Sequence, residues 1–413
     1  MNQPIEKGII RLKDLPQEEI LVGIKKEFKK KIFKHVKRKD VEKIGITSSQ
    51  FYNFKDNEKI TIKLLFKFCD YLTRKGFKEF SHSKTERNIG LMGTKRGDVY
   101  IKTPALPFNF NNKEGSYFIS AILFDGGIDK QAKPHYGNIH LKQRRRIAKY
   151  VKKIFGKIES NEINPTRGPM IRFPKSIGLT LNACFGIGIG NKIYHNNKIP
   201  SFIFKLDEKL KKDFLKQTFD DEGSVSISKR MIRISGTINI KKKEFHKDFT
   251  KKYNLLNGIR KILGDIGIET NSLRFSKHIS TKESGKRGNV YKHTFTFSIT
   301  GIENLERFHK QIGFNLDYKM KRLENLLKNY KQRQLRKGEI HKIALKECKK
   351  ITKGITIPFL AKKINRTYRQ TVRIVRNFEK QKLIQQIKPS INIGGKRFPA
   401  IYKVIQDKGK FLI

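Results

Sequence analysis

Two short segments of the chain follow one pattern. In each, an apolar run with helical spacing ends in an acidic residue, and a glycine, a small residue and a β-branched residue come next. The segments are residues 118–128, which carry Asp125, and residues 215–225, which carry Glu222. The two acids lie 97 positions apart. This spacing predicts a duplicated unit in which each copy contributes one carboxylate.

A helix that ends at a glycine beside an acid is also a common helix terminus, so one copy alone would carry little weight. Here each of the two motifs begins a pattern of alternating helices and strands. We expect a strand after each motif at 136–141 and 231–240, then a helix at 145–155 and 245–266, further strands and a closing helix. The predicted fold class is α+β, with two αββαββα halves at 115–205 and 206–334.

The charge of the chain points to a polyanionic partner. It has 92 Lys and Arg against 37 Asp and Glu, a formal net charge of +55. Such a surplus repels itself in isolation and favours nucleic acid, whose condensed counterions are released when phosphates are neutralised. A membrane surface is a weaker alternative because the basic residues are spread along the whole chain. A lysine-rich, solvated surface is the remaining alternative.

The cysteines favour a reducing compartment. The chain has three, Cys69, Cys184 and Cys348, without the paired spacing of a structural zinc site or a disulfide framework. The first residues do not resemble a signal peptide, and the apolar stretch 177–190 is too short and too rich in glycine to span a bilayer. We therefore expect a cytoplasmic, nucleoid-associated protein.

The first part of the chain, residues 1–83, is predicted to be a DNA-binding domain. Its residues 1–80 are expected to be all helical, beginning with a helix at 18–36. A short helix, a turn at Gly45, an N-cap at Thr47 and a second short helix follow. This order resembles the helix-turn-helix of phage-repressor-like domains, and a plain three-helix packing module is the alternative. The positions expected to face a DNA groove are Ser48, Ser49, Gln50 and Asn53. Residues 84–114 are expected to be a basic linker with a strand or two.

The last part, residues 338–413, resembles a winged-helix domain, with three helices and a hairpin around residues 394–395. Thr367 is expected to cap the third helix. A winged helix can also dock a protein, but the arginines gathered here favour DNA. The expected contacts are Arg366, Arg369, Gln370 and Arg373.

Residues 115–330 resemble a single-chain LAGLIDADG homing endonuclease in which both motifs are present. Two further segments share this likeness: the glycine-rich run 186–192 with Pro200, and residues 295–314 near the end of the second copy. The resemblance covers roughly half of the chain. It implies two motif helices packed along a pseudo-two-fold axis, with their terminal acids side by side over the DNA minor groove, and sheets that grip the major groove.

The resemblance also implies a metal-dependent reaction. Asp125 and Glu222 are the expected ligands, and the carbonyl oxygens of Gly126 and Gly223 can add to them. Mg²⁺, with Mn²⁺ as a substitute, prefers carboxylate, phosphate and water oxygens, and it can activate a water and stabilise a leaving oxygen. The two glycines are also expected to let the backbone approach DNA closely.

Polar residues at the end of the strand after each motif would stabilise charge at the phosphates in this family. These positions correspond to Lys142 and Gln143 in the first copy, and to Lys241 and Lys242 in the second. In so basic a chain they can equally be plain phosphate contacts. Further expected DNA contacts are Arg144, Arg145 and Lys192.

The interface between the motif helices departs from the family pattern. Close packing favours small residues four apart on the shared faces, and only Ser120 fits. Phe124, Gln217 and Asp221 occupy the other three places. This predicts a wider helix crossing or a degenerate copy.

Three functions remain open. The first is a monomeric, site-specific endonuclease for double-stranded DNA; the chain begins with Met1 and ends with Ile413, unlike an intein, so we expect it to be free-standing. The second is a non-catalytic transcription regulator that keeps the fold as a DNA clamp. The third is an RNA maturase, for which no single-strand-binding motif is present. The sequence has no P-loop, no dinucleotide fingerprint and no paired histidine ligands.

Overall fold

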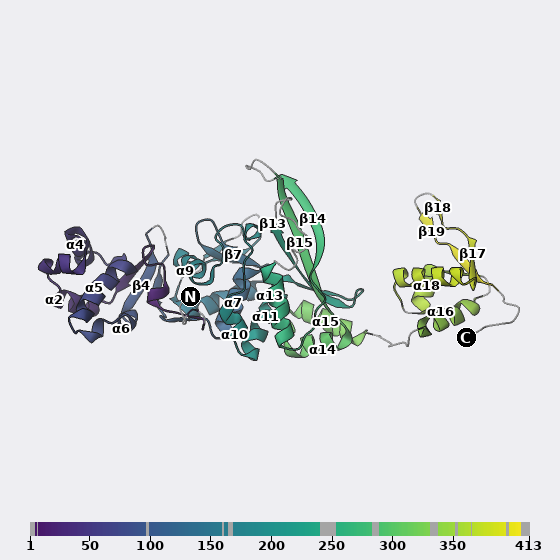
Figure 1. Cartoon of the computed structure of the whole chain (residues 1–413), viewed down its shortest axis with the longest axis horizontal. Coiled ribbons are helices and arrows are strands. Elements are labelled where there is room, and N and C mark those ends of the chain that lie inside the picture. The colour runs from purple at the N-terminus through teal and green to yellow at the C-terminus, as the bar shows by residue number, and fades with distance from the viewer. Residues whose placement is uncertain are drawn as a thin grey trace. The chain divides into compact units, whose positions relative to one another are not determined.

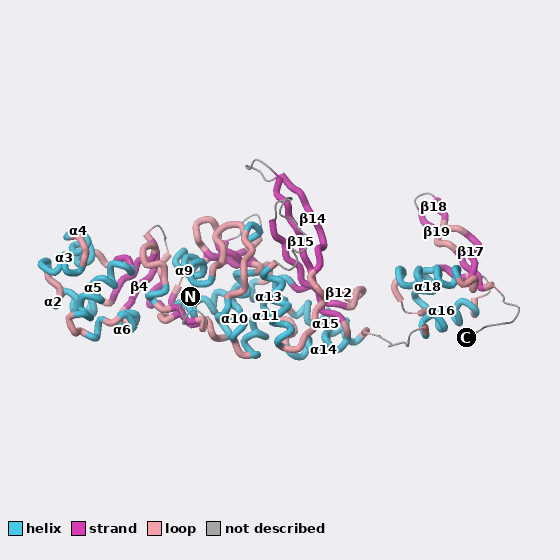
Figure 2. The backbone as a smooth tube through the Cα atoms, viewed as in Figure 1, coloured by secondary structure: helices cyan, strands magenta, loops and turns pink. Residues whose placement is uncertain are grey.

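The computed structural model describes residues 5, 7–95, 99–158, 161–163, 168–239, 253–282, 289–330, 338–351, 354–364, 366–393 and 396–405. The chain forms two compact units, Met1–Tyr330 and Lys331–Ile413. Both combine helices with small antiparallel sheets, as the ribbon and the coloured tube show (Figures 1 and 2). The fold is therefore α+β, as predicted. No helix in the described ranges is long and apolar enough to cross a membrane.

The duplicated unit lies within the first compact unit. Its first copy consists of α7 (Lys113–Leu123), β7 (Gly126–Ile128), β8 (Pro134–Gly137), α8 (Leu141–Phe155), β10 (Asn161–Ile163), β11 (Met170–Arg172) and α9 (Lys175–Phe185). Its second copy consists of α11 (Glu208–Glu222), β12 (Gly223–Ser226), β13 (Met231–Asn239), α13 (Asn254–Asp265), β14 (Arg274–Lys282), β15 (Asn289–Thr300) and α14 (Ile302–Gln311), and α15 (Asp317–Lys328) follows. Both copies are αββαββα.

The two sheets have the same strand order. In the first copy the order is β7-β8-β11-β10, and in the second it is β12-β13-β15-β14. The strand that follows the motif helix is at one edge of each sheet. In register, Gly126 pairs with Tyr136 and Gly223 pairs with Ile234. The duplication predicted from the two motifs is thus present in the topology as well.

The motif helices α7 and α11 form the centre of the duplicated unit. Every residue of α7 from Gly115 to Leu123 is buried, because a helix that is apolar on all sides needs neighbours on all sides. The hydroxyl groups of Ser120 and Thr218 lie 2.8 Å apart across the two helices. The helices therefore approach closely at this point, although only Ser120 fitted the expected pattern of small residues.

The strand β8 ends earlier than the predicted strand 136–141. Asn138 accepts a hydrogen bond from the backbone N–H of His140 through its side-chain oxygen, at 2.9 Å. This Asx turn redirects the chain, and α8 begins at Leu141, four residues before the predicted start at 145. The second-copy strand β13 agrees closely with its prediction, and residues 240–252 lie outside the described part.

The prediction that residues 1–80 are all helical is wrong. The segment predicted as one helix at 18–36 contains strand β2 (Ile20–Ile24) followed by helix α2 (Lys26–His35). β2 lies between β3 (Lys59–Thr61) and β4 (Ile89–Thr94), and it buries Ile20 and Val22 on one face. β-Branched residues in a paired strand bury such a face well, and here this outweighs the helical spacing of the same apolar residues.

The N-terminal region is not separated from the duplicated unit by a loose linker. Its five-stranded sheet has the order β3-β2-β4-β5-β9, and it includes β5 (Ile101–Pro104) and β9 (Gly156–Lys157), which directly follows α8. In addition, β1 (Ile9–Ile10) pairs with β6 (Phe108–Asn109). One continuous hydrophobic core extends from Ile10 to Leu326. The boundary predicted after residue 83 therefore falls in a helix, His82–Glu86, and strands from both sides of it form one sheet.

The remaining helices of the N-terminal region share a hydrophobic core with this sheet. They are α3 (Val41–Ile44), α4 (Ser48–Asp56), α5 (Ile62–Arg74) and α6 (His82–Glu86). Helix α5 is amphipathic and buries Leu65, Phe68 and Leu72. Helix α10 (Ser201–Lys205) belongs to the segment between the two copies.

The second compact unit has its own core. It contains α16 (Glu339–Lys349), β16 (Ile355–Thr356), α17 (Ile357–Lys363), α18 (Tyr368–Lys380), β17 (Ile384–Lys388), β18 (Ile391–Ile393), β19 (Lys396–Phe398) and β20 (Ile401–Val404). The three-stranded sheet has the order β16-β20-β17, and β18 pairs with β19. Leu360, Val375 and Phe378 are buried at its centre.

Candidate functional site

Each motif helix ends where the strand of its sheet begins. Asp125 stands between the end of α7 and Gly126, the first residue of β7, and Glu222 is the last residue of α11, directly before β12. Because the two helices pack side by side, both acids come from one end of the helix pair. The duplicated pattern therefore places two carboxyl groups at equivalent helix-to-strand junctions.

The glycines after the two acids are required by the protein's own backbone. A Cβ at Gly126 would lie 2.5 Å from the carbonyl oxygen of His135 and 2.7 Å from that of Ala121. A Cβ at Gly223 would lie 2.5 Å from the carbonyl oxygen of Phe219. Contacts this short are not tolerated, so these positions need glycine for packing alone. Their expected approach to DNA is not needed to explain them.

Asp125 is largely withdrawn from water. The side-chain amide of Asn138 donates a hydrogen bond to its Oδ2 at 3.2 Å. Burial raises the pKa of Asp125, and the positive charges of Lys192 and Lys319 oppose this rise. Asn138 therefore both ends strand β8 and orients the first acid.

Glu222 shares the same cations. Burial raises its pKa, the charge of Lys192 opposes the rise, and the negative charge of Asp125 adds to it. Glu222 lines a pocket with Lys192, His195 and Tyr253. Lys192 begins the short 3-10 helix Lys192–Tyr194, so the segment between the two copies supplies a positive charge for both motif acids.

A third acid, Asp221, contacts Asp125. Tyr136 donates its hydroxyl to Oδ1 of Asp221 at 2.8 Å, and the side-chain amide of Gln217 donates to the same oxygen at 2.8 Å. Burial and then the negative charge of Asp125 raise the pKa of Asp221 well above its ordinary value. The sequence argument treated Asp221 only as a misfit in the helix interface. Its position directly before Glu222 was a signal, but its contact with Asp125 comes only from the fold.

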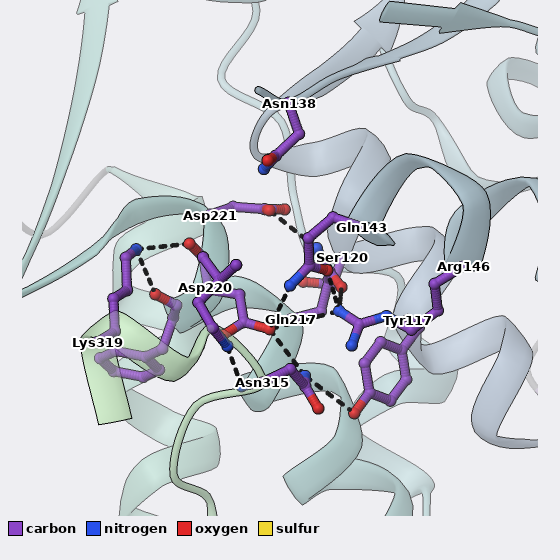
Figure 3. A network of polar contacts seen from close by, with 12 residues as sticks. Tyr117, Ser120, Asn138, Gln143, Arg146, Gln217, Asp220, Asp221, Asn315 and Lys319 are labelled. Atoms are coloured by element: carbon purple, nitrogen blue, oxygen red, sulfur yellow. Dashed lines mark hydrogen bonds and ion pairs between the residues drawn. The ribbon is translucent and has the colours of Figure 1, made fainter. Parts of the chain in front are cut away.

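Asp220 is the centre of a buried polar network that joins the two copies (Figure 3). It accepts hydrogen bonds from the backbone and side-chain amides of Asn315, at 2.9 and 2.7 Å. Gln143 donates to it at 3.3 Å, and Arg146 forms an ion pair with it at 3.4 Å. Arg146 also lies over the ring of Tyr117, 4.9 Å from its centroid. This acid is fully engaged in holding helices together.

Lys319, on α15, is buried at the C-terminal end of α11. Its ammonium group donates hydrogen bonds to the carbonyl oxygens of Phe219 and Asp220 (Figure 3). Burial lowers its pKa, and the surrounding carboxylates oppose this. A cation at a helix C-terminus is stabilised by the helix dipole, and here it also faces the acids. Sequence reasoning did not identify Lys319.

The basic and polar positions predicted beside the acids have different surroundings. Gln143 is buried in the first turn of α8 and is bonded to Asp220, whereas Lys142, its neighbour, is exposed. Arg144 is also buried, and its guanidinium donates to the carbonyl oxygens of Asn138 and Ile139, at 2.6 and 3.3 Å. Arg145 is exposed. Lys241 and Lys242 lie outside the described residues.

The geometry of α8 explains these differences. Lys142 and Gln143 were expected at the end of a strand, where successive side chains alternate between faces. Since the Asx turn at Asn138 starts a helix at Leu141 instead, Gln143 and Arg144 turn toward the core. The side chains of Gln143 and Arg144 therefore contact protein groups, while Lys142 and Arg145 remain accessible to a partner.

The helices expected to read DNA have the same type of N-terminus. Thr47 caps α4 and Thr367 caps α18, and in each the third helical residue, Gln50 or Gln370, closes a capping box. Gly45 precedes α4 with a left-handed φ of 71°. The exposed predicted contacts are Ser48, Ser49, Gln50, Asn53, Arg369, Gln370 and Arg373, and Arg366 is half-buried. The side-chain oxygens of both glutamines are engaged in the caps.

No protein-family model and no curated protein matches the chain. A solved structure of I-DmoI in complex with DNA and Mn is similar at 12% identity, covering 49% of this chain and 97% of that one, with a TM-score of 0.31. A second structure, of an I-DmoI variant with its target DNA and Mn, has 10% identity, covers 49% and 95% of the two chains, and has the same TM-score. At these values the likeness says nothing about function.

Proposed function

We propose that this protein is a site-specific endonuclease for double-stranded DNA of the LAGLIDADG homing type, acting as a monomer in the cytoplasm with the nucleoid. The observation that carries the proposal is the pairing of Asp125 and Glu222. Two copies of one αββαββα unit place these acids at equivalent ends of two contacting helices. Structural helix caps need no such pairing, whereas hydrolysis at two strands does.

The donor groups fit a divalent metal ion. Three carboxyl groups withdrawn from water lie at this end of the helix pair, and a buried oxygen of Asp221 has no hydrogen-bond partner in the described part of the chain. Oxygen ligands of this kind suit Mg²⁺ or Mn²⁺. The described residues contain no preformed group of three or more acidic, histidine or cysteine ligands, so DNA phosphate and water would complete the coordination.

In this mechanism Asp125 and Glu222 would hold the ion. The carbonyl groups of Gly126 and Gly223, which directly follow the two acids, would be additional ligands. The ion, when bound, would supply an activated water and stabilise the leaving oxygen. Asn138 orients the carboxyl group of Asp125, and Lys192 supplies positive charge to both acids. Among the basic residues that the structure describes, Lys192 is therefore well placed to stabilise charge at a phosphate.

The sheets provide the surface for the duplex. β13 and β15 bury Ile232, Ile234, Phe297 and Ile299 on one face. The alternate positions are polar. Arg233 on β13 is exposed, and the other residues of this face are half-buried: Ser235 and Thr237 on β13, and Thr294, Thr296 and Ser298 on β15. An antiparallel sheet with one buried and one polar face can dock against DNA. The capped helices α4 and α18 would add contacts outside the central site.

One observation favours the alternative of a non-catalytic DNA-binding regulator. Gln143, expected beside the scissile phosphate, is buried and bonded to Asp220. A fold that uses this position for internal packing can bind DNA without cutting it. Both motif acids are nevertheless present, so we favour the nuclease.

The test is incubation of the purified protein with its own flanking genomic DNA, with and without Mg²⁺. Asp125→Asn and Glu222→Gln should each abolish cutting and leave DNA binding nearly unchanged, because they remove a ligand charge and keep the shape. Glu208→Gln, at the exposed start of α11, is the matched control and should cut normally. Cleavage that survives both motif substitutions would show that the acids are structural. Specific binding without cutting in Mg²⁺ or Mn²⁺ would favour the regulator.

A further inference from the structure

The two copies differ at two neighbouring pairs of related positions. The residue before the motif acid is Phe124 in the first copy and Asp221 in the second. The residue paired with the following glycine is Tyr136 in the first sheet and Ile234 in the second. The first copy thus contributes Phe124 and Tyr136, and the second contributes Asp221 and Ile234. Tyr136 and Asp221 form a hydrogen bond between the copies, whereas the related pair, Phe124 and Ile234, is apolar and cannot form one. The pseudo-symmetry is broken by a polar contact between the copies.

This polar contact fixes one oxygen of Asp221 and leaves the other without a partner. Oδ1 accepts hydrogen bonds from Tyr136 and from Gln217, each at 2.8 Å. Oδ2 is buried and has no hydrogen-bond partner among the described residues. A buried carboxylate oxygen left unpaired is costly, so its position calls for a proton or a cation.

The surroundings of Asp221 narrow this choice. Asn138 links the Asp221 carboxyl group to that of Asp125, since the Asn138 side-chain amide donates to Oδ2 of Asp125 at 3.2 Å and to the hydroxyl of Tyr136 at 3.3 Å. The negative charges of the two acids oppose each other. A proton shared between the acids relieves this repulsion in the metal-free protein, and a divalent cation can replace that proton. The ammonium of Lys319 is committed to the carbonyl oxygens of Phe219 and Asp220. Lys192 stabilises the ionised forms of Asp125 and Glu222. A divalent cation binds two such oxygens together.

We propose that Asp221 is a third metal ligand, which with Asp125 forms a divalent-cation site stronger than the one at Glu222. The proposal rests on the proposed function, since it concerns the same acids, but it makes a separate claim. The two halves of the site are unequal, and the stronger metal position is built from one acid of each copy. The first copy has an apolar Phe124 where the second has Asp221, so only one such position exists in the pair.

Metal binding without DNA tests the proposal directly. Mn²⁺ is titrated into the full-length protein and followed calorimetrically and by the electron paramagnetic resonance of free Mn²⁺. Asp221→Asn should weaken the tighter Mn²⁺ site by about tenfold or more, since metal sites that lose a supporting or ligating carboxylate fall by this order. The variant should remain folded, because an asparagine oxygen still accepts from Tyr136 and Gln217. A circular dichroism melt checks this.

The matched control is Asp213→Asn. Asp213 lies on the same helix, eight residues before Asp221 and therefore about 12 Å along its axis. This control should leave Mn²⁺ affinity unchanged. Equal affinity of the wild type and Asp221→Asn would overturn the proposal, and so would a wild type that binds no Mn²⁺.

The outcome is independent of the nuclease test. If the wild type cuts DNA and Asp221→Asn keeps the same Mn²⁺ affinity, the third ligand is wrong and the nuclease stands. If Mn²⁺ affinity depends on Asp221 but no DNA is cut, the metal site stands and the nuclease is wrong.

Discussion

Ser120 and Thr218 join the two motif helices through their hydroxyl groups, which lie 2.8 Å apart although the residues are 98 positions apart in the chain. Thr218 donates its own proton to the carbonyl oxygen of Phe214, one turn earlier on α11, at 3.0 Å. A hydroxyl has only one proton to donate, so Ser120 is the donor and Thr218 the acceptor between the helices. These small hydroxyl side chains thus allow the two helices to approach closely, as glycine and alanine do in tighter helix pairs.

Enlarging this contact should push the motif helices apart. Ser120→Leu places a large side chain where both residues are fully buried, and we expect a loss of about 1–3 kcal/mol in the free energy of unfolding. Ser120→Ala, which removes the hydrogen bond but not the space, should cost only about 1 kcal/mol. Urea unfolding followed by circular dichroism measures both. Equal losses for the two substitutions would mean that the hydrogen bond rather than the spacing is important.

The duplicated architecture was predictable because each motif marks a junction between a helix and a strand. The acid, the glycine and the β-branched residue are local signals. The glycine is required by close backbone contacts, which involve Ala121 and His135 for Gly126 and Phe219 for Gly223. The strand β2 was not predictable in this way. Its apolar residues fit a helical period too, and only the pairing with β3 and β4, which come later in the chain, decides for a strand.

Substitution of Asp220, at the centre of the polar network, should lower the free energy of unfolding strongly. Asp220→Ala removes a fully buried carboxylate and leaves Arg146, Gln143 and Asn315 without their common partner. Breaking a buried ion pair from one side costs about 3–5 kcal/mol, and we expect a loss of this order. Urea unfolding provides the measurement.

The control for Asp220 is Asp213→Ala on the same helix, which should cost clearly less, since Asp213 is only partly buried. A double substitution, Asp220→Ala with Arg146→Met, should recover part of the loss, because it removes the uncompensated charge as well. If Asp220→Ala is no more harmful than the control, the network does not stabilise the fold.

In the absence of metal, Lys319 should stabilise the fold by placing a positive charge beside the ionised carboxylates at the end of α11. Lys319→Met removes the cation that binds the last carbonyl oxygens of α11, and we expect a loss of about 2–3 kcal/mol, as for hydrogen bonds that involve a charged group. Millimolar Mg²⁺ should reduce this loss, since the metal would supply positive charge to the same carboxylates. Melting temperatures in chelator and in Mg²⁺ measure the effect.

Lys321→Met, at an exposed position of the same helix, serves as the control for Lys319 and should leave both melting temperatures unchanged. A Lys319→Met variant that melts like the wild type in chelator would contradict the role of this lysine.

The site itself was only partly predictable. The positions of Asp125 and Glu222 follow from local pattern, but the roles of Gln143, Arg144 and Asp221 depend on contacts between the copies or on the Asx turn at Asn138. Asp221 shows the limit most clearly. The residue that gives its carboxyl group a fixed place, Tyr136, lies 85 positions away in the other copy. The expectation of small residues between packed helices cannot predict this hydrogen bond between Tyr136 and Asp221.

Asp40 should give the N-terminal region a pH-dependent stability. The hydroxyl of Tyr71 and then the backbone N–H of Lys37 donate to its carboxylate and lower the pKa of Asp40 below its ordinary value of 3.8. The ionised form is favoured in the folded state, so the stabilisation is complete above that value and is lost as the pH falls through the folded pKa. Asp40→Asn should therefore be less stable by about 1.5–3 kcal/mol at pH 7. Unfolding in urea at pH 7 and near pH 3 should show the difference shrinking, and a constant difference would refute the assignment.

Removing residues 331–413 should weaken DNA binding and leave the rest of the protein folded. The two compact units have separate hydrophobic cores, so the shortened protein should keep its melting transition. It should bind duplex DNA more weakly, because Arg369, Arg373 and the other basic residues of the C-terminal unit are lost. Each phosphate contact removed should lower the slope of log affinity against log salt by about 0.9. Filter binding over a series of salt concentrations gives both quantities. If the shortened protein binds with the same affinity and the same slope, α18 does not contact DNA, and the C-terminal unit must then serve another partner.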